Sequence, residues 1–155
     1  HINKNDVGIM GFSAGGHLAS SVSTHADEAV RPNFSILFYP VISMDERITH
    51  KGSCVNFLGE ERKTNAKLVE EWSNDKAVRP QVTPRVILLM SSDDKVVPPV
   101  TNGVAYYTAM NKAGNECTLH IYPSGGHGWG FRNTAQGFRY HIQMLDDLTT
   151  WLQHF

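Results

Sequence analysis

Short, strongly apolar runs alternate along the chain with segments whose apolar residues recur at helical spacing. Two of the runs, 34–39 and 85–90, are apolar on both faces, as expected for parallel strands that helices cover on both sides. The alternation therefore predicts the α/β class, with a parallel sheet of about four strands and helices on both of its faces. The predicted strands are 7–10, 34–39, 85–90 and 116–122, and the predicted helices are 16–24, the segment from Pro98 to about 113, and the C-terminal segment.

The spacing of apolar residues also predicts which helix faces pack on the sheet. In the helix after Pro98 and Pro99 these residues are Val100, Val104, Tyr107 and Met110. In the C-terminal helix they are Phe138, Ile142, Leu145, Leu148, Leu152 and Phe155. We expect each of these stripes to be buried.

Residues 43–83 interrupt the alternation, because they are polar and show only short helical patterns near 54–58 and 66–72. A loop of that length without structure of its own is uncommon in a compact domain. Two interpretations stay open: a lid-like excursion beside the functional site, or a surface insertion that only packs. The length fits one domain, residues 1–155, that includes this excursion.

Charge and composition exclude several classes of partner. The formal net charge is -1, and no run of like charges offers a basic surface to nucleic acid or a membrane. No apolar stretch is long enough to cross a bilayer, and the first residues lack the apolar core of a signal peptide, so the compartment stays open. No cluster of His, Cys or carboxylates has ligand spacing, so we expect no metal and no cofactor. Cys54 and Cys117 are interpreted as free thiols rather than a disulfide.

The turn after the first predicted strand contains a candidate catalytic serine. Gly11-Phe12-Ser13-Ala14-Gly15 is a G-x-S-x-G pattern between a strand and a helix, the setting of a nucleophile elbow. Small flanking residues allow the strained turn that directs the Ser13 hydroxyl toward its base and the substrate. The helix that follows directs its positive end, and the amide of Ala14, toward a developing oxyanion. We therefore expect Ser13 to be the nucleophile and Ala14 an oxyanion donor.

A nucleophilic serine needs a base, and His127 has the most suitable setting of the eight histidines. It lies in a glycine-rich loop directly after the last predicted strand, at the edge where parallel strands end. In this type of fold the acid falls between the serine and the histidine in sequence. Asp93 and Asp94 both qualify, and periodicity does not choose between them. His17, one helical turn beyond the serine, is expected to pack or to hydrogen-bond locally.

Three segments together carry a specific resemblance. They are Gly11-Phe12-Ser13-Ala14-Gly15-Gly16-His17-Leu18-Ala19, Asp94-Lys95-Val96-Val97-Pro98 and Pro123-Ser124-Gly125-Gly126-His127-Gly128-Trp129-Gly130. With these motifs in this order, essentially the whole chain resembles the acetyl-xylan esterase-like branch of the α/β-hydrolases. The resemblance implies that the acid is Asp94 rather than Asp93. Trp129 and Phe131 either line the acyl pocket or pack the loop, and we favour the pocket.

The same resemblance implies a partial α/β-hydrolase fold. Members of that branch have several strands and helices before the elbow, with a His-Gly-Gly-type loop that supplies a second oxyanion donor. This sequence has no such motif, so we expect a C-terminal half with a complete triad and one oxyanion amide. Losing one such donor typically lowers turnover by about 10²–10³. The strand at 7–10 then becomes an open edge, which we expect a second copy or an N-terminal segment to cover.

The implied function is hydrolysis of short-chain, acetyl esters of carbohydrates. Ser13 attacks the acyl carbon, His127 takes its proton and returns it to the alcohol, and Asp94 orients His127. The implied partner is a small ester or an acetylated carbohydrate. Two alternatives stay open: a serine peptidase of the prolyl-oligopeptidase type, and a catalytically impaired hydrolase-fold module that only binds or assembles.

Overall fold

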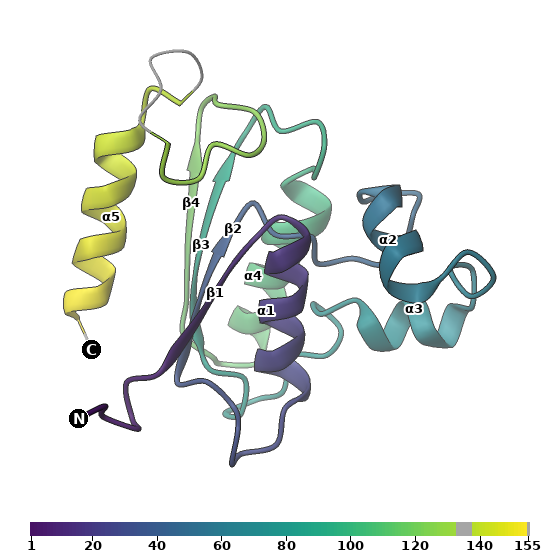
Figure 1. Cartoon of the computed structure of the whole chain (residues 1–155), viewed down its shortest axis with the longest axis horizontal. Coiled ribbons are helices and arrows are strands. Elements are labelled where there is room, and N and C mark those ends of the chain that lie inside the picture. Colours follow the sequence, from purple (N-terminus) through teal and green to yellow (C-terminus); the bar gives the residue numbers. More distant parts are fainter. Residues whose placement is uncertain (133–137, 155) are drawn as a thin grey trace.

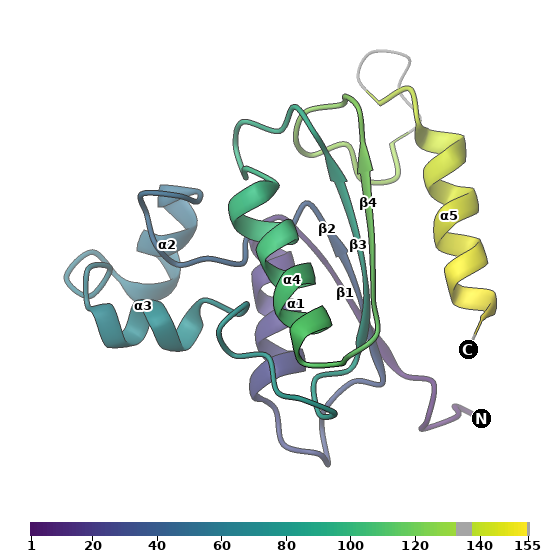
Figure 2. The ribbon, with the colours of Figure 1, turned by 180° about the vertical axis from the view of Figure 1, so that it is seen from behind.

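Parallel strands form the centre of the molecule in the computed structural model, which describes residues 1–132 and 138–154. Within these residues the sheet has the order β1-β2-β3-β4, with helices α1 and α4 on one face and α5 on the other (Figures 1 and 2). The predicted fold class is confirmed. The strands are β1 (Gly8–Phe12), β2 (Phe34–Phe38), β3 (Arg85–Ser91) and β4 (Cys117–Tyr122), and the helices named so far are α1 (Ala14–His25), α4 (Ala105–Lys112) and α5 (His141–Gln153).

Strands β2 and β3 are buried on both faces because their side chains alternate between two apolar clusters. Ile87 and Leu89 pack toward α5, whereas Val86 and Leu88 pack toward α1 and α4. Full burial of one such side chain contributes about 1.5–3 kcal/mol. The continuous apolar run of β3 is therefore explained by its two covered faces.

The C-terminal helix packs on the sheet with a stripe that matches the predicted one only in part: Leu148 is buried and Leu145 packs against the core, as predicted. Met144, Leu148 and Trp151 are buried, whereas Ile142 is 74% exposed and Leu152 is also exposed. Phe138 is buried but precedes α5, which begins only at His141, and Phe155 lies outside the described residues. The predicted stripe was anchored on Phe138, which is not helical, and this placed it about one residue out of register with the buried face.

The helix after Pro99 begins with a π-helical turn, η1 (Val100–Val104), before α4 continues it. The amide of Val104 donates to the carbonyl of Pro99 at 2.9 Å, five residues back. This wider turn rotates the following residues, so Asn102, Gly103, Tyr106 and Met110 are buried while Val100 is 70% exposed. The predicted burial of Val100 is therefore wrong.

The segment 43–83 forms two short helices, α2 (Lys51–Leu58) and α3 (Ala66–Trp72), beside α1 and away from the sheet (Figure 1). Each begins at a side-chain cap: His50 accepts from the amide of Ser53, and Asn65 accepts from the amides of the first turn of α3. The helices have a small core of their own, made by Val41, Met44, Cys54, Leu58 and Val97. The predicted helical patterns are confirmed, and the lid-like role stays a prediction.

Strand β1 forms one edge of the described sheet, with Val7 and Met10 exposed beside it. Its covering by a second copy or by an N-terminal segment stays a prediction. Cys54 and Cys117 are free thiols, as predicted, and burial raises the pKa of Cys54 to about 11 and that of Cys117 to about 12. No helix in residues 1–132 and 138–154 combines the length and apolar character needed to cross a membrane.

Candidate active site

Ser13 lies on a sharp turn between β1 and α1. Its backbone has φ 54° and ψ −119°, a conformation that costs a non-glycine residue on the order of 1–3 kcal/mol. Hydrogen bonds on both sides hold the turn: the Ser13 amide donates to Phe38 O at 3.0 Å, and its carbonyl accepts from Val41 N at 3.0 Å and Gly16 N at 2.9 Å. The strained turn directs the Ser13 hydroxyl away from the sheet and toward the loop after β4.

The two glycines of the pattern have different steric roles. A Cβ on Gly11 would lie 2.1 Å from the carbonyl oxygen of Gly15, whereas a Cβ on Gly15 would meet nothing within 4 Å. Of these two glycines, only Gly11 is therefore required by the packing of the elbow.

We expect Gly11→Ala to lower the free energy of unfolding by about 1–3 kcal/mol, because backbone atoms have to move to admit the methyl group. The matched variant Gly15→Ala is expected to unfold within about 1 kcal/mol of the wild type, on the stabilising side, because alanine is the better helix former. Urea unfolding followed by circular dichroism measures both. Equal losses in the two variants would contradict this assignment.

The predicted base, His127, meets the predicted nucleophile, Ser13, across the sheet. Ser13 follows β1 and His127 follows β4, which lie three strand spacings apart, or roughly 14 Å. The loop after β4 turns back over the ends of the intervening strands with positive φ at Gly125 (139°), Gly126 (61°), Gly128 (84°) and Gly130 (50°). His127 Nε2 thereby lies 2.8 Å from Ser13 Oγ.

Asp94, the predicted acid, is only 4% exposed. Its Oδ2 lies 2.7 Å from His127 Nδ1, and its Oδ1 accepts from the amides of Val96 and Val97, each at 2.9 Å. These bonds fix the carboxylate and direct one oxygen at the imidazole. The structure thus brings Ser13, His127 and Asp94 into one hydrogen-bonded chain.

Asp93 does not contact the imidazole but holds the backbone of the same loop. Its Oδ1 accepts from the amide of Gly126 at 2.8 Å, and this bond is the main cause that lowers the pKa of the carboxyl. Ser91 Oγ accepts from Trp129 Nε1 at 2.9 Å. The end of β3 therefore attaches the loop at three places: Gly126, His127 and Trp129.

Sequence reasoning did not identify Ser91 or Tyr39 as parts of the site. Ser91 was recognisable as a hydroxyl at the end of an otherwise apolar strand. Tyr39, in contrast, has no feature in the surrounding sequence that indicates a place beside the site. Its ring centroid lies 4.7 Å from that of His127, and burial raises the pKa of its phenol above the ordinary value of 10.0. Tyr39 therefore packs against the imidazole without adding charge.

The two aromatic residues of the loop have different environments. Trp129 is 6% exposed, and its ring stacks on Phe138 with a centroid distance of 3.8 Å. This position fits loop packing rather than the favoured role in an acyl pocket. Phe131 is exposed and lies 5.9 Å from the ring of Phe12, next to the nucleophile, so it stays a candidate for substrate contact.

A pocket of about 200 Å³ adjoins the candidate oxyanion donor. Among the described residues the amide of Ala14 has no backbone acceptor, which leaves it available to a substrate oxygen. The pocket is mostly apolar, with two polar side chains from α2. Its lining consists of Ala14, His17, Leu18, Met44, Ser53, Asn56 and Phe57. The wall that α2 supplies carries no sequence motif, so sequence reasoning did not find it.

His17 packs and hydrogen-bonds, as predicted, but its partners lie in the excursion and not locally at the elbow. Its Nε2 donates to the carbonyl of Trp72 at 2.8 Å, and its ring meets the ring of Phe57 edge-on at 4.7 Å. Burial lowers the pKa of His17 below its ordinary value of 6.5. The folded chain therefore holds this imidazole neutral.

We expect the free energy of unfolding to decrease more steeply from about pH 7.5 to about pH 5 in the wild type than in His17→Gln. As the pH falls through 6.5, the unfolded chain protonates this histidine while the folded chain, whose pKa is lower, does not. Protonation of His17 thus favours the unfolded state, and His17→Gln lacks this contribution. Urea unfolding at each pH measures the difference, with the exposed His154→Gln as the matched substitution. Parallel curves for wild type and His17→Gln would contradict it.

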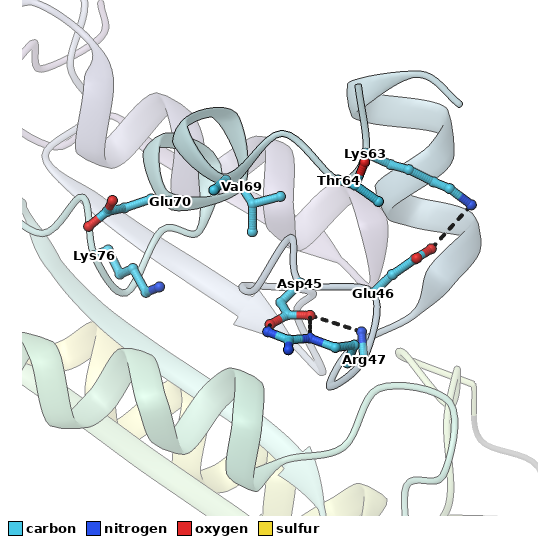
Figure 3. Close-up of a pocket in the computed structure, with 9 residues that line it drawn as sticks. Asp45, Glu46, Arg47, Lys63, Thr64, Val69, Glu70 and Lys76 are labelled. Carbon is cyan, nitrogen blue, oxygen red and sulfur yellow. Dashed lines mark hydrogen bonds and ion pairs between the residues drawn. The ribbon is translucent and has the colours of Figure 1, made fainter. Parts of the chain in front are cut away.

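A second hollow, of about 480 Å³, lies within the excursion and is strongly polar (Figure 3). Its charges neutralise one another: the Asp45 carboxylate faces the Arg47 guanidinium at 2.6 Å, and Lys63 pairs with Glu46 at 3.3 Å. The bond from Arg47 lowers the pKa of Asp45 to about 2. In residues 1–132 and 138–154 no cluster of three His, Cys, Asp or Glu side chains is placed to hold a metal ion.

Comparison with known proteins identifies relatives over the whole chain. An acetylxylan esterase of Xylanibacter ruminicola is 59% identical over 153 residues, which cover 99% of this chain and 31% of that protein. The crystal structure of an acetyl ester-xyloside bifunctional hydrolase from Caldicellulosiruptor lactoaceticus superposes with a TM-score of 0.83 at 34% identity, over 98% of this chain and 58% of that chain. This chain thus spans about a third of the first relative and under two thirds of the second.

An acylaminoacyl peptidase from Pyrococcus horikoshii shares the fold, with a TM-score of 0.78 at 16% identity, over 97% of this chain and 24% of that chain. The resemblance to acetyl-xylan esterases predicted from the three motifs is confirmed. The sequence profile of the prolyl oligopeptidase family matches residues 1–154. Because that match covers nearly every residue, the chain belongs to the prolyl oligopeptidase family.

Proposed function

We propose that this chain carries the catalytic triad of a serine carboxylic-ester hydrolase that removes acetyl groups from carbohydrates. One observation carries the proposal: Ser13 Oγ, His127 and Asp94 form a continuous chain, with donor–acceptor distances of 2.8 and 2.7 Å. Such distances are those at which a general base accepts the proton of its nucleophile.

In the proposed reaction Ser13 Oγ attacks the carbonyl carbon of the ester while His127 Nε2 takes its proton. The negative charge that develops on the carbonyl oxygen faces the amide of Ala14 at the start of α1. His127 then gives the proton to the departing sugar hydroxyl, which leaves an acetyl group on Ser13. Water repeats the sequence and releases acetate, and Asp94 keeps the imidazole in one tautomer throughout.

The substrate class rests on the relatives and on the pocket beside Ala14. A 59% identical protein is named an acetylxylan esterase, and a 34% identical structure is named an acetyl ester-xyloside bifunctional hydrolase. A pocket of about 200 Å³ that is mostly apolar suits a small acyl group or part of one sugar. Asn56 and Ser53 add hydrogen-bonding groups to that wall.

The same pocket supports a lid-like role for the excursion 43–83. Met44, Ser53, Asn56 and Phe57 all come from this segment, and they face the first turn of α1 across the pocket. We propose that the excursion forms the substrate side of the site rather than a surface insertion that only packs.

A peptidase is the second candidate, because the family that the chain belongs to takes its name from an oligopeptidase. We expect the chain to release acetate from an acetylated xylo-oligosaccharide and to leave a proline-containing peptide p-nitroanilide intact. Acetate assay and absorbance at the p-nitroaniline band measure the two, each beside Ser13→Ala. Cleavage of the anilide alone would favour the peptidase, and no Ser13-dependent cleavage of either would favour the impaired module.

A further inference from the structure

Asn102 is a buried polar residue that joins three separate segments near the site. It is 0% exposed and lies on the π-helical turn η1. Its Oδ1 accepts from the amides of Ile42 and Ser43 at 2.9 and 3.1 Å and from the Thr49 hydroxyl at 2.9 Å. Its Nδ2 donates to the carbonyl of Pro98 at 3.0 Å. A single side chain thus connects the segment after β2, the excursion and the loop after β3.

One of these connections leads directly to the nucleophile. Val41, next to Ile42 in the chain, donates its amide to the carbonyl of Ser13 at 3.0 Å. The residue that Asn102 holds, Ile42, is therefore the next residue after Val41, whose amide holds the strained turn of Ser13.

The opposite end of the same side chain leads to the acid. Pro98 follows Val97, whose amide donates to Asp94 Oδ1 at 2.9 Å. Val97 is fully buried in the small core of the excursion, so the loop is fixed on that side by packing. The Pro98 carbonyl, in contrast, is held by Asn102.

We propose that Asn102 is a positioning residue that fixes the loop of Asp94 relative to the turn of Ser13. The proposal rests on the proposed function, since it takes these two residues as acid and nucleophile. The chemistry of asparagine suits the place: the oxygen accepts several donors on one side while the amide nitrogen donates on the other. Aspartate lacks that donor, and glutamine is longer by a methylene that a packed interior does not accommodate without strain.

The π-helical turn has a role in this arrangement. Its extra residue per turn brings Asn102 into the interior, where the regular spacing had predicted Val100 and Val104 as the buried residues. Single π-helical turns of this kind are frequent at functional sites.

Asn74 provides a matched control, because it is equally buried and also joins two segments. Its Nδ2 donates to the carbonyl of His17 and to the hydroxyls of Ser20 and Ser21, at distances of 2.7–3.2 Å. These bonds connect α1 with the end of the excursion and do not involve the loop of Asp94. Asn74→Ser therefore removes a comparable network without touching the acid.

The first test is proton NMR of the chain of 155 residues, which needs no turnover. The Nδ1 proton of a histidine bonded to a buried carboxylate is strongly deshielded, and Asp94→Asn identifies this signal for His127. We expect the signal to shift or broaden in Asn102→Ser and to persist in Asn74→Ser. Asn102→Asp at about pH 8 is the second variant: one oxygen of the ionised carboxylate can still accept the three bonds, whereas the other repels the carbonyl of Pro98 instead of donating to it.

The second test is steady-state hydrolysis of p-nitrophenyl acetate. We expect kcat of Asn102→Ser to fall about 10²-fold with KM nearly unchanged, because a displacement of about 1 Å in a catalytic group has an effect of that size. In the background Asp94→Asn the same substitution is expected to have a much smaller effect, because the part that acts through the loop of Asp94 is already lost.

The outcomes separate this proposal from the proposed function. Absence of Ser13-dependent hydrolysis in the wild type counts against the function, while the NMR signal still reports on the role of Asn102. An unchanged signal in both Asn102 variants, or equal disturbance in Asn74→Ser, would overturn the positioning role. A full Asn102→Ser effect on kcat in the Asp94→Asn background would also overturn it, because Asn102 would then act on something other than the acid.

Discussion

Replacement of Ser13 by alanine is expected to reduce turnover of p-nitrophenyl acetate to the spontaneous rate. Loss of a triad nucleophile typically lowers kcat by about 10⁶-fold, because the acyl-enzyme no longer forms. The substitution removes one oxygen, which lies 2.8 Å from His127 Nε2, and leaves the backbone bonds of the elbow in place. The fold is therefore expected to persist while the chemistry is lost.

Steady-state kinetics and covalent labelling measure this effect independently. A fluorophosphonate is expected to add one adduct to the wild type, on Ser13 in peptide mass spectrometry, and none to Ser13→Ala. The matched control is Ser92→Ala, an exposed serine at the same end of the sheet. An adduct on another serine, or turnover that Ser13→Ala retains, would contradict the assignment of the nucleophile.

The second large effect is expected for Asp94→Asn, at about 10⁴-fold in kcat. An asparagine that kept its oxygen on the amides of Val96 and Val97 would turn its NH₂ group toward His127 Nδ1. The imidazole would then accept at Nδ1 and carry its proton on Nε2, which faces Ser13. That tautomer cannot take a proton from the nucleophile.

The neighbouring carboxylate gives the matched control. Asparagine at position 93 retains an oxygen that accepts from the amide of Gly126, so Asp93→Asn is expected to change kcat only slightly. Kinetic constants of the two variants, measured with the same ester, separate orientation of the imidazole from attachment of its loop. Similar losses of kcat in Asp93→Asn and Asp94→Asn would contradict the assignment of Asp94 as the acid.

Much of the fold follows from local pattern, because both faces of the inner strands are buried. The run Arg85-Val86-Ile87-Leu88-Leu89-Met90 has no polar residue after Arg85, and such a segment is stable only when helices cover it on two sides. Helix faces were less predictable. The π-helical turn after Pro99 coincides with contacts between distant segments, in which Asn102 accepts from Ile42, Ser43 and Thr49, and no local spacing encodes these contacts.

The site was predictable where its chemistry requires particular residues in particular turns. Ser13 and His127 are in that group. Periodicity did not choose between Asp93 and Asp94, since both follow β3; the family resemblance implied Asp94, and the path of the glycine-rich loop brings Asp94 to the imidazole. The sequence did not predict Phe57 and Asn56 as pocket residues, because the pocket wall depends on how the excursion folds back on α1.

The placement of the triad also has a consequence for refolding. The hydrogen-bonded pair Ser13 and His127 is separated by 114 positions in sequence, and they follow the two outer strands of the sheet. Parallel pairing of distant segments is slow, because chain entropy is lost before contacts compensate for it. Hydrolysis and fluorophosphonate labelling should therefore appear only after every crossover has formed, later than the helical signal in circular dichroism. Activity of the proposed triad is therefore expected to report a late event in folding.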